Sequence, residues 1–154
     1  MTGIVFKSLG ILFKCFCFLF LFPLHIFICL YFLADVCNDY KPLTDGTRKY
    51  YYITANSKCD DTLNGWYRFQ ELAGTKMVTK CHVSINKCDA SFPAWLSEDH
   101  PTVAEGTATR KVCIRRNGNC CFDSVKIQVK NCSSYYIYKL LNPGSCNTRY
   151  CSMD

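Results

Sequence analysis

The distribution of cysteines constrains this chain most strongly. Ten of its 13 cysteines stand between Cys37 and Cys151, and the segment before them is strongly apolar. An even number of cysteines at this density, in a short chain with a secretory leader, predicts a disulfide framework rather than metal sites or redox catalysis. Cys120 and Cys121 are adjacent, and a bond between neighbouring residues is strained, so each is expected to pair with a distant cysteine. Spacing alone leaves the other pairings open.

Residues 1–34 are expected to be a hydrophobic leader helix. Lys7 and Lys14 are the only charged residues in it, and 15–34 carry no formal charge. The apolar stretch is longer than the roughly 7–15 residues of a signal peptide and just reaches the about 20 residues of a membrane-spanning helix. A cleaved signal peptide and an uncleaved signal anchor both fit, with a slight preference for cleavage after Ala34. Both place residues 35–154 in the secretory lumen or outside the cell, and the membrane is contacted only through an uncleaved leader.

Residues 35–154 have the composition of one small extracellular domain. Lys7 and Lys14 account for two of the 18 basic residues, so this part carries a net charge of +4. Its basic residues are not clustered with a nucleic-acid-binding motif, so no nucleic-acid partner is expected. No repeat, low-complexity tract or Pro-, Gly- or Ser-rich linker divides it.

The local pattern predicts strands rather than helices in this domain. Residues 126–130 alternate polar and apolar side chains, which is typical of a half-buried strand. Asn117-Gly118 indicates a tight turn. Further strands are expected at 50–54, 65–70 and 135–140, and short helical turns are considered around 92–97. The predicted fold class is a small, disulfide-rich, β-dominated domain of antiparallel strands cross-linked by five disulfides, with an α+β variant left open.

Metal and catalytic sites are not expected. Cys146 and Cys151 approximate a zinc-ligand pair, but no second pair has matching spacing. Adjacent carboxylates, such as Asp60 with Asp61 and Glu98 with Asp99, usually point apart, so we expect solvated turn residues there. His100 is expected to hold a turn by hydrogen bonds. No nucleophile-elbow, metalloprotease or phosphate-binding motif occurs, so the chain is predicted to be no enzyme and to need no cofactor.

Two segments are candidates for ligand contact. Trp66, Tyr67 and Arg68 combine aromatic faces with a cation, which suits glycans and cationic ligands. The alternative that we favour places Trp66 and Phe69 in the core, with Tyr67 and Arg68 on the surface or half-buried. A second candidate is the basic stretch 110–116, in which Arg115 and Arg116 follow Cys113. It suits acidic glycans, although a solvated edge that blocks aggregation is the favoured interpretation.

The whole of 37–151 resembles the cysteine-rich domain of uromodulin and zymogen-granule glycoprotein 2. No single motif is decisive, and the specific signal is their order together with the cysteine spacing. The motifs are Cys37-Asn38-x-Tyr40, Cys59-Asp60-x-x-Leu63-x-Gly65-Trp66-Tyr67-Arg68-Phe69, Cys81-x-Val83 with Cys88, Pro93-x-Trp95-Leu96, His100-Pro101-Thr102, Glu105-Gly106, Cys113, Cys120-Cys121, Ile127-x-Val129-Lys130-x-Cys132, Tyr136-x-Tyr138-x-Leu140 and Arg149-Tyr150-Cys151.

The resemblance implies five pairings and a recognition role. The implied disulfides are Cys37–Cys132, Cys59–Cys146, Cys81–Cys120, Cys88–Cys151 and Cys113–Cys121. The implied function is an extracellular recognition or adhesion module for glycans or glycoproteins. In uromodulin the stretch after Trp-Leu carries a glycosylation acceptor that presents a decoy glycan. Residues 95–100 here have no such asparagine, so that role is not expected to transfer.

Two alternatives to glycan recognition stay open. The first is a structural matrix or mucus component without a specific ligand, and the second is a polyanion-binding module that uses the 110–116 edge. Asn131-Cys132-Ser133 is the only Asn-x-Ser/Thr sequence, and Asn131 is therefore the candidate glycosylation site. Its middle residue is a cysteine that is expected to be bonded.

Overall fold

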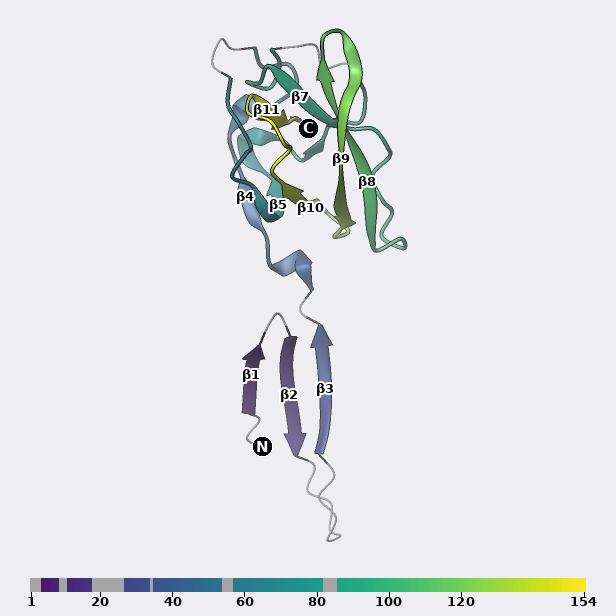
Figure 1. The fold of residues 1–154 in the computed structure, drawn as a ribbon. Helices are drawn as coiled ribbons and strands as arrows, with labels where there is room; N and C mark the ends of the chain where they lie inside the picture. The colour runs from purple at the N-terminus through teal and green to yellow at the C-terminus, as the bar shows by residue number, and fades with distance from the viewer. Residues whose placement is uncertain (1–3, 9–10, 18–26, 34, 54–56, 82–85) are drawn as a thin grey trace. The chain divides into compact units, whose positions relative to one another are not determined.

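A computed structural model of the chain describes residues 4–8, 11–17, 27–33, 35–53, 57–81 and 86–154 (Figure 1). The described residues belong to two compact units, Met1–Asp39 and Tyr40–Asp154. Each unit has its own sheets.

The described part of the first unit contains three strands and a short 3-10 helix. The strands β1 (Ile4–Ser8), β2 (Ile11–Cys17) and β3 (Phe27–Leu33) pair antiparallel in that order. The helix η1 (Val36–Asn38) follows, and the Asp35 carboxylate accepts a hydrogen bond from Cys37 N at 3.1 Å. A helix was expected over residues 1–34, whereas the described residues of this leader lie in the three strands. Residues 1–3, 9–10, 18–26 and 34 lie outside the described part.

The described ranges contain no helix long and apolar enough to cross a membrane.

The second unit is built on a mixed seven-stranded sheet in the order β11-β7-β8-β9-β10-β5-β4. Neighbours pair antiparallel except at the two ends, where β4 lies parallel to β5 and β11 parallel to β7. A two-stranded sheet pairs β12 with β6. The strands are β4 (Lys41–Leu43), β5 (Asn64–Phe69), β6 (Lys76–Met77), β7 (Phe92–Leu96), β8 (Thr107–Arg116), β9 (Asn119–Asn131), β10 (Tyr136–Leu141), β11 (Thr148–Tyr150) and β12 (Ser152–Met153), with 3-10 helices η2 (Gly46–Arg48) and η3 (Glu71–Ala73).

The centre of this sheet is the long hairpin of β8 and β9, which run side by side in Figure 1. Asn117 and Gly118 form the turn, with φ of 50° and 76°. Two successive residues with positive φ are what a tight hairpin turn requires, and Asn-Gly supplies them at low steric cost. The predicted turn is confirmed.

One face of the sheet holds the core. Along β9, Ile127 and Val129 are buried while Lys126 and Gln128 between them are exposed, as the period of two predicts. Because Tyr138 and Leu140 of β10 belong to the same buried cluster, the exposed Lys139 between them lies on the opposite face. The β-dominated fold class is confirmed.

The local strand predictions succeeded where alternation was clear. Strands β5, β9 and β10 contain or overlap 65–70, 126–130 and 135–140. The helical turns considered at 92–97 are wrong, because Phe92–Leu96 is strand β7 in the core of the sheet. The strand at 50–54 is also wrong over 50–53, which form a turn with a single bridge from Ile53 to Lys87. Thr54 lies outside the described residues.

Disulfides cross-link residues of the second unit that lie from 8 to 87 positions apart in the sequence. The structure contains Cys59–Cys146, Cys81–Cys120, Cys88–Cys151 and Cys113–Cys121. These are four of the pairs that the resemblance implied, and Cys120 and Cys121 have different partners. Cys37 and Cys132 are also disulfide-bonded.

A buried ion pair connects η2, which contains Arg48, to Asp60 in the segment before β5, and Asp60 in turn contacts β11. Arg48 Nη1 and Nη2 lie 2.8 and 2.7 Å from the two carboxylate oxygens of Asp60. Asp60 is only 2% exposed and also accepts a hydrogen bond from Tyr150 N at 2.9 Å. The sequence-based expectation of a solvated turn carboxylate is therefore wrong for Asp60. Its partner lies 12 residues away in the sequence, and no local pattern indicates that pairing.

A second buried arginine extends this network. Arg149 of β11 contacts the Asp45 carboxylate at 2.7 Å and donates to Thr47 Oγ1 at 2.7 Å. Lys58 reaches the same Asp45 oxygen at 2.8 Å. Burial alone would raise the pKa of Asp45, but hydrogen bonds from Lys58, Thr47 and Arg149 together hold that pKa well below its usual range. The Asp45 carboxylate is therefore charged at neutral pH.

Candidate binding face of the sheet

The face of the sheet opposite the core carries a row of polar and aromatic side chains. Pairing places Thr109 opposite Gln128, Gln128 opposite Lys139, and Lys139 opposite Trp66. The row therefore crosses four strands, from β8 through β9 and β10 to β5. Thr109, Gln128 and Lys139 are exposed and Trp66 is half-buried. Side chains directly opposite one another in neighbouring strands have Cβ atoms about 4.5–5.5 Å apart, so this row forms one continuous surface.

A shallow groove of about 390 Å³ lies on this face. None of the residues that line it is acidic, and two are lysines, Lys126 and Lys139. The remaining lining residues are Asn64, Thr109, Ile127, Gln128, Leu140 and Leu141. Amide, hydroxyl and ammonium groups beside a tryptophan form a surface suited to a hydroxylated, negatively charged ligand.

The predicted aromatic platform is split between the two faces of β5. Tyr67 is 6% exposed and belongs to the core with Phe69. Trp66 and Arg68 alternate with these residues and therefore point to the other face. The ligand-platform interpretation and the favoured core interpretation both placed Tyr67 at least partly on the surface, which is wrong. The favoured interpretation also placed Trp66 in the core, whereas Trp66 is half-buried. Strand alternation, which puts 67 and 69 on one side, is the signal that would have corrected them.

Arg68 is itself held in an aromatic stack. Its guanidinium lies 3.8 Å from the centre of the Tyr135 ring and 5.7 Å from that of Tyr40. Nη1 also donates to the Tyr40 hydroxyl at 2.9 Å. Through these contacts Arg68 stabilises the positions of the Tyr40 and Tyr135 rings.

The basic stretch 110–116 is dispersed by the fold. Arg110 makes an ion pair with Glu105 at 2.7 Å. Arg115 Nη1 lies 3.3 Å from Cys81 Sγ, against the Cys81–Cys120 disulfide. Arg116 packs over Phe92, 4.7 Å from the ring centre, and over Phe122. Lys111 alone of this stretch extends the polar row, because it lies directly opposite Lys126.

Asn131 is engaged within the fold. Its Nδ2 donates to Pro101 O at 3.0 Å, and its Oδ1 accepts from Ser133 N at 2.9 Å. The side chain is half-buried and the next residue, Cys132, is disulfide-bonded. Glycosylation at Asn131 stays a prediction.

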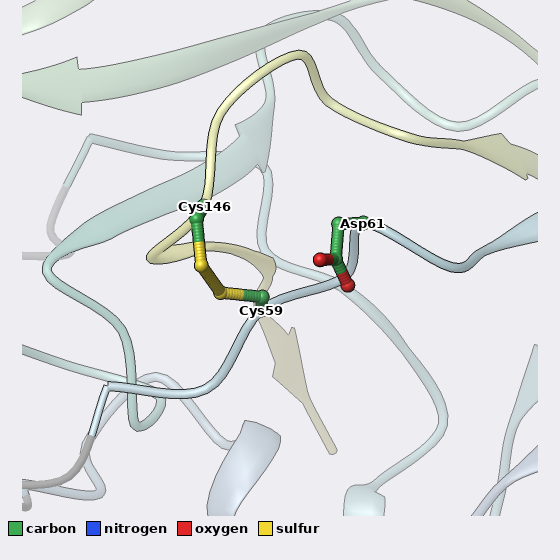
Figure 2. Close-up of side chains that lie close together, drawn as sticks. All are labelled: Cys59, Asp61 and Cys146. Carbon is green, nitrogen blue, oxygen red and sulfur yellow. A yellow bond between two sulfur atoms is a disulfide. The ribbon is translucent and has the colours of Figure 1, made fainter.

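One group of potential metal ligands gathers at Cys59, Asp61 and Cys146 (Figure 2). The two sulfur atoms are bonded to each other, so neither is a thiolate that could bind zinc. Asp61 alone among them offers a free ligand atom. The group is therefore a disulfide beside a carboxylate.

His100 connects the loop after β7 to the core. Its Nε2 lies 2.8 Å from the Tyr138 hydroxyl, which also accepts a hydrogen bond from Met77 N at 3.0 Å. The ring packs on Tyr136 with centroids 4.4 Å apart. Burial, with the nearby Lys76 cation, lowers the pKa of His100 to about 4. In the neutral tautomer that carries its proton on Nδ1, His100 Nε2 accepts a hydrogen bond from the hydroxyl group of the buried Tyr138.

This geometry predicts acid sensitivity that originates in His100. Its folded pKa of about 4 is below the ordinary 6.5, so the unfolded chain binds more protons between these values and stability falls as pH drops through that window. The expected loss is about 1 to 2 kcal/mol after allowance for partial solvent screening. Urea unfolding at pH 7 and pH 4.5 measures it. The His100→Gln variant, which keeps an acceptor for Tyr138, should lose less stability than the wild type, and an equal loss in both would contradict the assignment.

Comparison with known proteins places the domain in a family. The model of a uromodulin-like domain family matches residues 67–152, which is more than half of the chain. The pancreatic secretory granule membrane major glycoprotein GP2 of Rattus norvegicus is 38% identical over 122 residues, covering 77% of this chain and 23% of that protein. Uromodulin of Mus musculus is 40% identical over 119 residues, covering 77% and 18%. The chain thus spans about a fifth of the length of these curated relatives.

The matched residues include most of the strands that form the groove. Strands β8, β9 and β10 lie wholly within 67–152, and the disulfides Cys81–Cys120, Cys88–Cys151 and Cys113–Cys121 do as well. Motifs, fold and family model therefore agree, and the chain belongs to the uromodulin-like domain family.

Proposed function

We propose that this chain is a non-enzymatic extracellular recognition module that binds glycans on the polar face of its sheet. The groove beside Trp66, with amide, hydroxyl and ammonium groups and no acidic lining, is the observation that carries the proposal. Sugars bind proteins through hydrogen bonds to their hydroxyl groups and through the stacking of their apolar faces on aromatic rings. Lys126 and Lys139 favour glycans that carry negative charge. One relative is named as a membrane glycoprotein of secretory granules, which supports a setting in the secretory pathway.

We also propose that residues 35–154 form the extracellular domain and that 1–34 direct the chain into the secretory pathway. The disulfide-bonded state of ten cysteines supports this, because such bonds persist in oxidising compartments. Protein recovered from culture medium with Asp35 as its first residue would indicate cleavage. An intact chain retained in membranes would indicate the anchor instead.

The glycan proposal predicts specific effects of two substitutions. We expect the protein purified from eukaryotic cells to bind acidic glycans on an array, and Trp66→Ala to weaken that binding about 3- to 10-fold by removal of the stacking surface. Lys139→Gln removes one cation without disturbing the core and should weaken binding as well. Isothermal titration calorimetry, which does not depend on Trp66 as a reporter, gives the affinities of the wild type and of both variants.

Tyr51→Ala is the matched control, because Tyr51 is 53% exposed and does not line the groove. It should bind like the wild type. If Tyr51→Ala weakens binding and Trp66→Ala does not, the site is wrongly placed. If the wild type binds nothing on a broad array, the structural matrix role is the better account.

A further inference from the structure

We propose that Lys111 and Lys126 form a seat for one anionic group, a sulfate or carboxylate carried by a saccharide. This inference rests on the proposed function and names the chemistry that the polar face selects. The two lysines lie directly opposite each other on β8 and β9, on the face away from the core. Both side chains are exposed.

The pairing of like charges is the first observation. Residues directly opposite in an antiparallel pair have Cβ atoms about 4.5–5.5 Å apart, and like charges in such positions destabilise a sheet. An anion between the two ammonium groups would change that repulsion into two attractions. A local arrangement that opposes stability is the kind of feature expected at a binding site.

The absence of a compensating carboxylate is the second observation. Among the described residues, neither lysine makes an ion pair with an acidic side chain. The Glu98 carboxylate comes close to Lys111, but it accepts a hydrogen bond from the backbone N at 2.6 Å. By contrast, Arg110, the neighbour of Lys111 in the sequence, is paired with Glu105. The charge of the Lys111–Lys126 pair is therefore available to a ligand.

The surroundings of the pair are the third observation. Lys126 lines the groove together with Gln128, Thr109 and Lys139. A saccharide whose anionic group sits between Lys111 and Lys126 would place its ring over Gln128 and Thr109, whose amide and hydroxyl groups can bind sugar hydroxyls. Lys139, diagonally placed from Lys126, offers a second charge to a neighbouring residue of the glycan.

The seat is tested first without any glycan, using inorganic sulfate. Thermal unfolding is measured in sodium sulfate and in sodium chloride of equal ionic strength. We expect sulfate to raise the melting temperature of the wild type by a few degrees more than it raises that of Lys126→Gln or Lys111→Gln. In low salt both variants should melt about 2 to 4 °C above the wild type, because the repulsion is gone. Lys80→Gln, an exposed lysine outside the groove, should behave like the wild type.

Sulfate also stabilises proteins generally, by exclusion from their surfaces, so the difference between variants is the decisive quantity. Equal sulfate effects in the wild type, Lys111→Gln and Lys126→Gln would overturn the seat. Unchanged or lowered melting temperatures of both variants in low salt would overturn the repulsion argument on which it depends.

Two polymers then distinguish the chemical source of the anion. Dextran sulfate carries sulfates without carboxylates, and desulfated heparin carries carboxylates without sulfates. We expect Lys126→Gln to lower affinity for the preferred polymer about 2- to 5-fold, the effect of losing one exposed charge pair, and Lys80→Gln to leave it unchanged. Array binding that survives Lys111→Gln and Lys126→Gln but not Trp66→Ala would overturn the seat and leave the proposed function intact. A working sulfate seat with no glycan bound would overturn the proposed function instead.

Discussion

The Asp60→Asn variant should lose about 3 to 5 kcal/mol of unfolding free energy, because it removes one partner of a buried ion pair. Arg48 is 6% exposed and would keep its charge without a carboxylate to balance it. Tyr150 N would also lose a charged acceptor. This loss is comparable to the whole stability of many small domains, so we expect poor secretion as well. Urea unfolding of the purified variant measures the change.

Asp61→Asn is the matched control for this prediction. Asp61 is the next residue, is exposed and has no role in the buried network, so its substitution should change stability by less than about 0.5 kcal/mol. The double variant Arg48→Met with Asp60→Asn should lose less than the sum of the two single losses, since both substitutions act on one interaction. Equal effects of Asp60→Asn and Asp61→Asn would show that the ion pair contributes little.

Replacing Cys88 and Cys151 together by Ala should have an effect of similar size. This bond joins residues 63 positions apart, and both cysteines are completely buried. In the chain-entropy model, closing a loop of that length stabilises a domain by about 4 kcal/mol. The bond also anchors the segment between β11 and β12. We expect a strongly lowered melting temperature and little secreted protein.

The pair Cys113 and Cys121 provides the comparison. Their bond closes a loop between residues only eight positions apart, and the hairpin of β8 and β9 already holds those residues together. The same model gives about 2.5 kcal/mol for that length, so the Cys113→Ala/Cys121→Ala variant should be the more stable of the two. The reverse order would mean that local packing, and not loop length, decides the contribution of each bond.

Local patterns predicted those parts of the fold that depend on neighbouring residues. The alternation at 126–130 identified β9, and Asn117-Gly118 identified the turn before it. The strand prediction at 50–53 was wrong because an aromatic and β-branched composition favours a strand only when a partner strand is available. The prediction of helical turns at 92–97 was wrong because Phe92–Leu96 pairs with β8 and β11. This long-range pairing makes the segment a strand, although its composition does not indicate one.

The candidate site was only partly predictable. Trp66 was singled out from the sequence, and its contact with a ligand stays a prediction, whereas its neighbour Tyr67 belongs to the core. Lys126 and Lys139, which line the groove, were not singled out, because they stand far apart in the sequence and only the pairing of β9 with β10 brings them together. Arg115 and Arg116 looked like a basic cluster in the sequence. In the fold, Arg115 contacts the Cys81–Cys120 disulfide and Arg116 packs on Phe92 and Phe122.

The sequence by itself determined the class of this protein: a β-dominated, disulfide-rich domain of the uromodulin-like family. The number of cysteines, the apolar leader and the strand periodicity are local or compositional properties, so they can be read from the sequence without knowledge of the fold. Tertiary structure decided which charges are buried and which are free. Asp60 and Asp61 are chemically identical neighbours, but only Asp60 meets Arg48 in the interior. Likewise Arg110 meets Glu105 while Lys111 faces Lys126, because long-range strand pairing, and not sequence proximity, sets the partner of each charge.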